Sequence, residues 1–249
     1  PYNSGGSHVG NLVLTDDATV GGARFDQRQG TITGDYWLTV KNKGAEASDV
    51  FAVCEKIDGI SVKGIRVTDG GNLQLCMPRV KAPAGIELSQ NGGLATWSAF
   101  SLSKDLAVTV GKGGGRIFSD AQMGTYLGPV TVTAGNTLRI TNGTWNQHAP
   151  VCFAGTLVND GVIDVTAATL FVSGKVTGRG VFRATGGRLD LSEADLSGFK
   201  GKIEGVKDGR VFLPDLDIRA KFASLKDWQP GEWPVVRRFD GDHLSEISM

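Results

Sequence analysis

Short runs in which apolar and polar residues alternate recur along the chain and are most regular between Gly155 and Leu213. Two of these runs, Val162–Val165 and Thr169–Val172, each return twice at steps of about 20 residues, a spacing typical of solenoids. Alternation with a period of two places the apolar side chains on one face of a strand. The pattern therefore predicts short β-strands at fixed intervals, with copies of the two runs at Val181–Arg183, Lys202–Glu204, Arg188–Leu191 and Arg210–Leu213.

A strand of three or four residues cannot bury an apolar face alone, but stacked coils share one continuous core. A coil of about 20 residues holds two or three short strands and their turns, whereas a propeller blade needs about twice that length. Glycines and Asn-Asp or Asp-Gly pairs between the runs permit the backbone angles of tight corners. We therefore predict an all-β protein, a parallel β-helix (β-solenoid) with coils of about 20 residues. The alternative is an antiparallel sandwich, in which strands recur roughly every 8–12 residues.

The flanking segments are less regular, and the chain divides into three expected parts. Residues 1–58 are predicted to hold N-terminal strands and a cap of the solenoid, 59–220 the solenoid repeats, and 221–249 a closing segment. Further short strands are expected at Leu12–Leu14, Thr31–Thr33, Tyr36–Val40, Leu73–Leu75, Ile86–Leu88, Leu94–Trp97, Leu106–Val110, Val130–Val132 and Thr137–Ile140.

Four segments depart from the regular spacing of the coils. Ala45–Ile57 fits a helical stripe as well as a buried strand, so a short helix capping the solenoid stays open there. Phe222–Trp228 suggests another short helix, and Trp233–Phe239 an apolar-basic strand. Trp145–Phe153 interrupts the rhythm and is expected to form a loop that leaves the coils.

Composition and charge narrow the class of protein. The chain of 249 residues contains 36 glycines but only 8 prolines, which fits many tight turns and few helices. Lys plus Arg equals Asp plus Glu at 26 each, so nothing indicates an electrostatic footprint for nucleic acid or for an anionic membrane. No apolar run approaches the roughly 20 residues that span a bilayer, so we expect no membrane insertion by this segment.

Cysteines and chain ends give weaker indications. Cys54, Cys76 and Cys152 share no CxxC spacing, which argues against a zinc site, and their odd number leaves buried thiols or one disulfide open. Pro1 is not an initiator methionine, so we expect a processed chain or a fragment. His243–Met249 shows no closing cap, which leaves a continuation beyond Met249 open.

Three passages share a further pattern. Gly155–Gly174 is similar to the run GTLxNxGxIxVxxxTLxVSG, Gly187–Gly205 to GxLxLxxxNxxFxGxI, and Gly113–Ile140 to a companion half that opens with GGGxI. Leu225–Phe239 is similar to the segment that closes such arrays. These passages resemble the autotransporter-associated β-strand repeats in the β-helical passenger domains of bacterial surface proteins. The resemblance implies a β-helical fold and an adhesive or structural role outside the cell, and it supplies no catalytic residues.

Candidate chemistry is sparse. Asp215 and Asp217, if they lie on one strand, point to the same face about 7 Å apart, a separation that glycoside hydrolysis permits. None of the histidines has a Ser or Cys neighbour in a nucleophile-elbow pattern. The Asp240–His243 turn lacks the further oxygen ligands of a calcium-binding loop. Gly111–Gly115 lacks the continuation of a phosphate-binding loop and is predicted to be a glycine turn.

Aromatic residues point more weakly towards binding. Trp145 and His148 lie in the segment expected to leave the coils and are the candidate binding residues. A carbohydrate-stacking platform is another use of the aromatic side chains, although tryptophan also serves as an ordinary core residue. The residues concerned are Tyr36, Trp37, Trp97, Trp145, Trp228 and Trp233.

Three functions remain in view. The first is an extracellular or cell-surface module, structural or adhesive, in which a rigid stalk presents loops to host or matrix glycans or proteins. The second is a polysaccharide-degrading β-helix enzyme with Asp215 and Asp217 as its candidates. The third is a coat or filament protein that binds copies of itself. No cofactor and no metal are expected for any of them.

Overall fold

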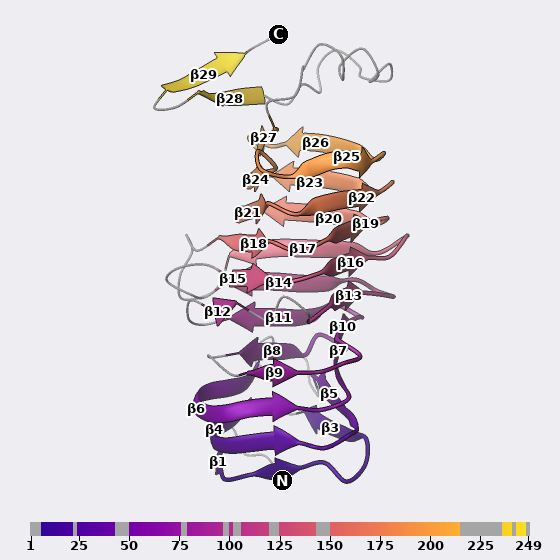
Figure 1. Ribbon diagram of the computed structural model, residues 1–249, viewed down its shortest axis with the longest axis vertical. Coiled ribbons are helices and arrows are strands. Elements are labelled where there is room, and N and C mark those ends of the chain that lie inside the picture. The colour runs from indigo at the N-terminus through magenta and orange to yellow at the C-terminus, as the bar shows by residue number, and fades with distance from the viewer. Residues whose placement is uncertain are drawn as a thin grey trace.

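The described chain winds into a column of stacked strands. The computed structural model describes residues 6–21, 24–42, 50–75, 79–96, 100–101, 106–119, 125–142, 150–214, 236–240 and 243–247. Within these residues every regular element is a strand, and successive coils follow one another about 21 residues apart. The coils lie one above the other along the long axis (Figure 1). The predicted all-β parallel solenoid and its coil length are confirmed.

Three sheets line the column, and each receives one strand from a typical coil. Sheet A contains β1 (Gly6–Val9), β4 (Arg24–Thr33), β6 (Val50–Ser61), β8 (Asn72–Leu75), β11 (Gly92–Thr96), β14 (Gly115–Ser119), β17 (Thr137–Asn142), β20 (Val162–Thr166), β23 (Val181–Thr185) and β26 (Lys202–Val206). Two short strands join its side, β2 (Leu12–Val13) beside β4 and β9 (Val80–Lys81) beside β6.

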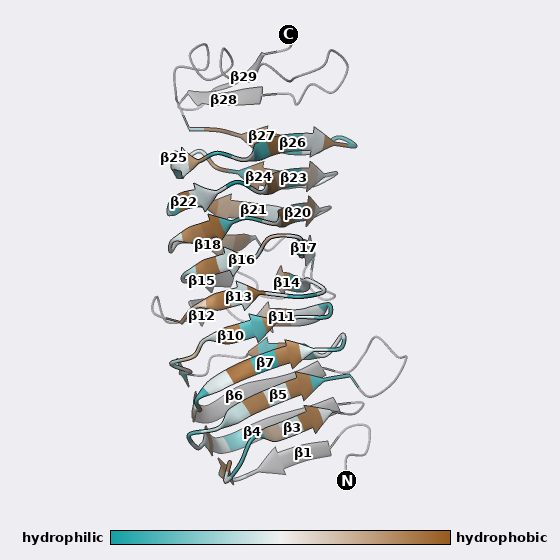
Figure 2. Cartoon of the chain, turned by 90° about the vertical axis from the view of Figure 1, so that its right-hand side faces the viewer, coloured by the Kyte–Doolittle hydropathy of each residue, from teal (hydrophilic) through white to brown (hydrophobic). Residues whose placement is uncertain are grey.

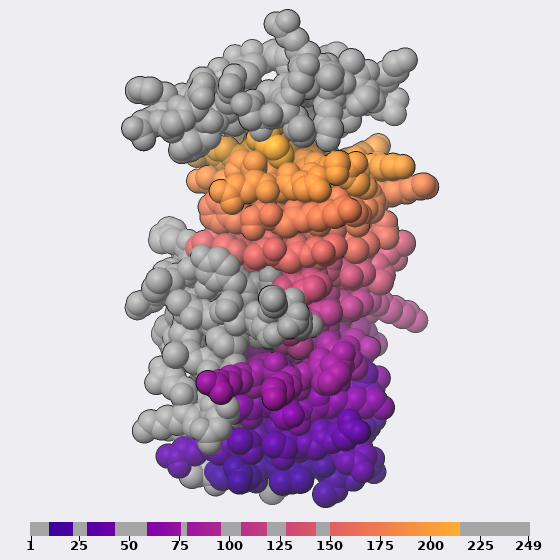
Figure 3. Space-filling view, viewed as in Figure 1, coloured from indigo at the N-terminus to yellow at the C-terminus, as the bar shows by residue number. Residues whose placement is uncertain are grey.

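Sheets B and C complete the coil. Sheet B contains β3 (Ala18–Gly21), β5 (Trp37–Lys41), β7 (Gly64–Thr68), β10 (Ile86–Leu88), β13 (Val108–Val110), β16 (Val130–Val132), β19 (Leu157–Asn159), β22 (Lys175–Gly178) and β25 (Asp195–Phe199). Sheet C contains β12 (Phe100–Ser101), β15 (Thr125–Leu127), β18 (Val151–Phe153), β21 (Thr169–Val172), β24 (Arg188–Asp190), β27 (Arg210–Phe212), β28 (Val236–Asp240) and β29 (His243–Ile247). Neighbouring strands in the three sheets run parallel, except β28 and β29, which are antiparallel. The successive colour bands in Figure 3 show that each described coil keeps to its own layer.

The core consists of apolar columns that run across the coils. In sheet A, Leu94, Ile117, Ile140 and Val165 are paired in register and are completely buried. Sheet B provides an equivalent column of buried residues, formed by Leu38, Ile65, Ile86, Val108, Val130 and Leu157. Hydrophobic segments accordingly recur on the strands of successive coils (Figure 2). Because each apolar side chain is covered by its neighbours above and below, a strand of three residues is enough.

Polar side chains at the corners tie one coil to the next. The Oδ1 atom of Asp160 accepts a hydrogen bond from the backbone N–H of Arg179 at 3.0 Å, and Oδ1 of Asn136 accepts one from Gly113 at the same distance. Glycine is required where the backbones of two corners touch, since a Cβ on Gly174 would lie 1.9 Å from the carbonyl oxygen of Gly155. The Asn, Asp and Gly residues that interrupt the sequence pattern therefore have two tasks, turning the chain and joining the coils.

The N-terminal coils are built differently from the later ones. The second halves of β4 and β6 pair beside β2 and β9, so one long strand serves two sides of the coil. Register shifts between Gln27 and Gln29 and between Gly30 and Thr31 mark the bend. Gly30 has a φ of 83°, and a Cβ there would lie 2.4 Å from the carbonyl oxygen of Gly10. From β12 onwards the third side has strands of its own.

Two expectations need correction. The helical alternative for Ala45–Ile57 is wrong over its described part, because Val50–Ile57 belongs to β6 between β4 and β8. A continuous apolar run has no clear period, so pairing on both sides decided its structure. Val151–Phe153 does not leave the coils either, since it forms β18 between β15 and β21.

Other expectations lie beyond the described residues or are confirmed. The helix expected at Phe222–Trp228 and the segment 143–149 fall outside the described part of the chain. The strand expected at Trp233–Phe239 is described from Val236, where β28 begins. The predicted glycine turn is confirmed over Gly111–Gly114, and Gly115 is the first residue of β14.

Candidate functional site

The residues that the sequence singled out for catalysis and binding are not brought together by the described structure. Asp215, Asp217, Trp145 and His148 all lie outside the described residues, so their roles stay predictions. Asp240 and His243 are paired residues of β28 and β29, at the turn between these strands.

The cysteine and metal expectations are tested only in part. Cys152 is a half-buried residue of β18, Cys54 lies in β6, and Cys76 is outside the described residues. In the described ranges, no three His, Cys, Asp or Glu side chains gather closely enough to hold a metal ion.

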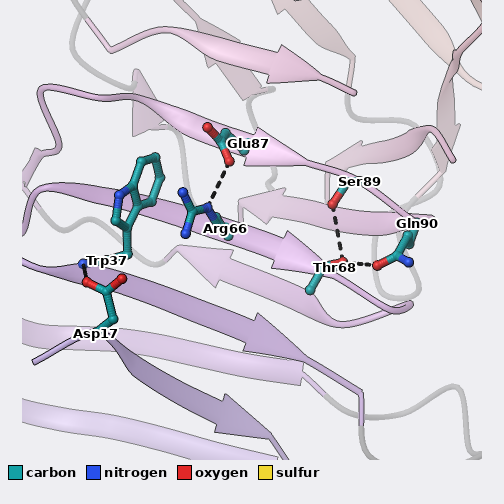
Figure 4. A network of polar contacts seen from close by, with 7 residues as sticks. All are labelled: Asp17, Trp37, Arg66, Thr68, Glu87, Ser89 and Gln90. Carbon is teal, nitrogen blue, oxygen red and sulfur yellow. Dashed lines mark hydrogen bonds and ion pairs between the residues drawn. The ribbon is translucent and has the colours of Figure 1, made fainter. Parts of the chain in front are cut away.

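A polar cluster does form on the outer face of sheet B, where three consecutive coils meet. We call Trp37, Arg66 and Glu87 the Trp37 cluster; they come from β5, β7 and β10 (Figure 4). The central carbon of the Arg66 guanidinium lies 3.8 Å from the centroid of the Trp37 ring, and its Nε donates to Oε2 of Glu87 at 3.0 Å. The cluster thus combines a stacked cation with an ion pair across two coil boundaries.

The in-register stacking of coils explains how these three side chains meet. Arg66 and Glu87 are paired residues of β7 and β10, while Trp37 is paired with Gly64, two positions before Arg66 on the same face. A Cβ on Gly64 would lie 2.4 Å from the Trp37 ring, so only glycine admits the indole at this place. The indole of Trp37, which extends from β5 over Gly64, therefore lies beside the guanidinium of Arg66 on β7.

Hydrogen bonds at both sides of the Trp37 cluster hold the strands that carry it. The backbone N–H of Trp37 donates to Oδ1 of Asp17 at 3.0 Å. At the far end of β7, the Thr68 hydroxyl donates to Oε1 of Gln90 at 2.6 Å and accepts from the Ser89 hydroxyl at 3.2 Å (Figure 4). Each of these bonds joins one coil to the next, so the strands that carry the cluster are tied together on both sides of it.

The chemistry of the Trp37 cluster favours binding or coil stabilisation over catalysis. Glu87 is its one carboxylate, and that carboxylate is already paired with an arginine. Glycoside hydrolysis needs two carboxyl groups, and nucleophilic catalysis needs a nucleophile with a base beside it. The Arg66 and Glu87 side chains are 41% and 45% exposed, so the pair is open to solvent and available to a ligand.

A second cluster, on the outer face of sheet C, is more buried. Asp190 accepts hydrogen bonds from Nη2 of Arg188 at 2.8 Å and from both the hydroxyl and the backbone N–H of Ser192. The Arg188 guanidinium also lies 4.4 Å from the ring centroid of Phe212 and 5.3 Å from that of Phe171. Arg188 therefore contacts rings of the coils on both sides, while Asp190, whose side chain is only 6% exposed, holds it within its own coil.

The sequence contained a signal for the ion pair of the Trp37 cluster that single-strand patterns miss. Arg66 and Glu87 are 21 residues apart, and so are Arg183 and Glu204, which form a second ion pair at 3.1 Å. Opposite charges separated by one coil length become neighbours once the coils stack in register. The aromatic list included Trp37, but its partners could be found only through this spacing.

Comparisons with protein families, curated proteins and solved structures identified no relative of this chain. No protein-family model matches the chain. No curated protein and no solved structure matches it either. Among the described residues, no helix is long and apolar enough to cross a membrane.

Proposed function

We propose that this chain is a rigid β-helical module of a bacterial extracellular or cell-surface protein, with a structural or adhesive role. Its sides present surface groups to glycans or proteins of a host or matrix. The observation that carries the proposal is the unbroken parallel pairing from β1 to β26 in sheet A, which joins every coil to the next. The resemblance of three passages to autotransporter-associated repeats supports the same role.

The physical basis for a stalk is that bending between neighbouring coils would disrupt several kinds of contact at once. Every coil is held to its neighbours by backbone hydrogen bonds in the sheets, by shared apolar columns and by corner side chains. In a solenoid each coil contacts its neighbours, so stiffness extends along the axis as coils are added. A stiff column keeps a surface group such as the Trp37 cluster at a fixed distance from its anchor.

A binding and cleavage screen tests this function against the enzymatic alternative. The purified protein is passed over immobilised matrix proteins and polysaccharides, and the same polysaccharides are assayed for new reducing ends. A stalk or adhesin should bind at least one surface and release no sugar ends. Cleavage that disappears in the double variant Asp215→Ala with Asp217→Ala would replace the proposal with a carbohydrate-active enzyme.

A second candidate, self-assembly, is favoured by the end of sheet A. Within the described residues, β26 pairs with β23 and no further strand of this sheet is described beyond it. Free strand edges are templates for another strand. Light scattering that rises with protein concentration, together with filaments under the electron microscope, would favour a coat or filament. A monomer at all concentrations would favour the stalk.

A further inference from the structure

Two neighbouring arginines lie on the outer face of sheet A, and neither forms an ion pair within the described residues. Arg116 of β14 and Arg139 of β17 are paired residues on adjacent coils. Adjacent strands lie about 4.8 Å apart, so the two side chains start from neighbouring positions. No ion pair joins either arginine to a carboxylate in the described part of the chain. The two positive charges therefore belong to neighbouring coils, and neither is ion-paired within the described residues.

The other charges of the same column are accounted for. It continues through Asp164, Arg183 and Glu204, which follow Arg139 in register on β20, β23 and β26. Arg183 forms its ion pair with Glu204, and Asp164 accepts a hydrogen bond from the Thr185 hydroxyl at 2.8 Å. The excess of positive charge is thus confined to Arg116 and Arg139, and a carboxylate follows it immediately.

The Arg116 side chain is held in place by a hydrogen bond to another coil. Its Nη2 reaches across two coils and donates to Oδ1 of Asn72 at 3.0 Å, while Asn72 itself is only 5% exposed. The coil between them carries Gly93 at the corresponding position, where a Cβ would lie 2.1 Å from Oδ1 of Asn72. The absence of a side chain at Gly93 therefore makes room for this bridge.

The surroundings of Arg116 oppose its charge. Its Nε is buried and has no hydrogen-bond partner among the described residues. Burial first, and the nearby charge of Arg139 second, lower the pKa of Arg116 from its ordinary value. A cation that is partly desolvated and faces a like charge is stabilised by an anion.

We propose that Arg116 and Arg139 form a site for one oxyanion, a carboxylate or sulfate group carried by an acidic polysaccharide. Guanidinium groups match the planar geometry of carboxylates and bind sulfate-like oxyanions through several donors. Arg139 is exposed and offers the accessible donors, while the bridge to Asn72 pre-orients Arg116. The inference rests on the proposed adhesive role and adds the chemical class of the partner.

A polysaccharide fits the charge pattern better than a nucleic acid. Nucleic acids present closely spaced phosphates and are bound by extended basic surfaces. Here Asp164 follows the arginine pair directly, and the whole chain has no net formal charge. A chain with spaced acidic groups can place one of them on the pair and keep the others away from Asp164.

The test compares two variants against charged and neutral polymers. Wild-type protein, Arg139→Gln and the control Arg183→Gln are passed over immobilised dextran sulfate, polygalacturonate and neutral dextran. Arg183 lies two coils further along the same column and is paired with Glu204. We expect the wild type to bind one or both acidic polymers in a salt-dependent manner and to ignore neutral dextran. Arg139→Gln should bind about tenfold more weakly or worse, and Arg183→Gln should bind like the wild type.

Several outcomes would overturn the assignment. Equal binding by wild type and Arg139→Gln would place the anion elsewhere, and tighter binding to a single-stranded DNA oligonucleotide would change the ligand class. Inorganic sulfate that binds as tightly as dextran sulfate would make the site a free-anion site. If the wild type binds neutral surfaces or matrix proteins but no acidic polymer, this site fails while the adhesive function stands. Unchanged thermal unfolding of Arg139→Gln verifies that the variant is folded.

Discussion

Ile163 of β20 pairs in register with Phe182 of β23, and both side chains are completely buried although they are a whole coil apart in sequence. Ile203 of β26 takes the next place in the same column. The relationship is repeated in all three sheets, which makes the coil the unit of both folding and stability.

Removing the Phe182 ring should greatly lower the free energy of unfolding. Phe182→Ala deletes a fully buried side chain that also packs edge-on against Phe199, with ring centroids 5.1 Å apart. Such truncations cost about 3–5 kcal/mol because they leave a cavity. Urea unfolding should show this loss, whereas Arg183→Ala on the opposite face should cost less than about 1 kcal/mol. Similar losses for the two variants would mean that Phe182 is not in a packed core.

Glycines at the corners should differ sharply in their tolerance of a methyl group. A Cβ on Gly209 would lie 1.9 Å from the carbonyl oxygen of Ala184, while on Gly111 the nearest atom would be 4.0 Å away. Gly209→Ala should therefore destabilise the protein by about 1–3 kcal/mol or more, because the backbones of two coils must separate. Gly111→Ala should be neutral or stabilising by up to about 1 kcal/mol. Thermal unfolding of both variants checks the contrast, and the reverse order would refute the close approach at Gly209.

The two carboxylates at Asp190 and Glu204 should contribute unequally. Asp190 is buried and accepts three hydrogen bonds, so Asp190→Ala leaves Arg188 and Ser192 without their acceptor. We expect a loss of about 1–3 kcal/mol in the free energy of unfolding. Glu204→Ala removes a solvent-exposed ion pair and should cost at most about 1 kcal/mol. Equal effects in a denaturant titration would show that Asp190 is not held as described.

The ion pair of the Trp37 cluster should be weak and sensitive to salt. A double-mutant cycle of Arg66→Ala and Glu87→Ala should give a coupling energy of about 0.2–1 kcal/mol, because both side chains are more than a third exposed. Raising the salt concentration should reduce the coupling. Arg66→Ala alone should cost a further fraction of a kcal/mol through the lost stacking on Trp37. A coupling that is independent of salt would indicate a buried pair and a different surface.

Much of the fold could be predicted from the sequence because the coil repeats almost in register. Aligning Val162–Val165 with Val181–Arg183 and Lys202–Glu204 gave the same pairing as strands β20, β23 and β26. Aligning Thr169–Val172 with Arg188–Leu191 likewise gave the pairing of β21 with β24. Alternating residues set which face is buried, so register followed from hydrophobicity alone.

The rest could not be predicted because it depends on contacts between coils. The long strands β4 and β6 bend at bulges and glycines, and no local pattern distinguishes Val50–Ile57 in β6 from a helix. Arg116 meets Asn72 across two coils only because Gly93 lies between them, a relationship that needs the register first. The pairing of Arg116 with Arg139 could not be predicted either, because it also depends on the register between coils.

A distance between spin labels on one face tests the rigid column most directly. Thr39 of β5 and Thr177 of β22 lie six strand steps apart on the outer face of sheet B, and both are replaced by cysteine after Cys54, Cys76 and Cys152 are changed to serine. At about 4.8 Å per strand step, double electron–electron resonance should give one narrow distribution of label-to-label distances centred at about 30 Å. Only the flexibility of the labels should broaden it. A broad distribution, or a centre displaced by more than about 10 Å at this strand spacing, would contradict a rigid parallel solenoid.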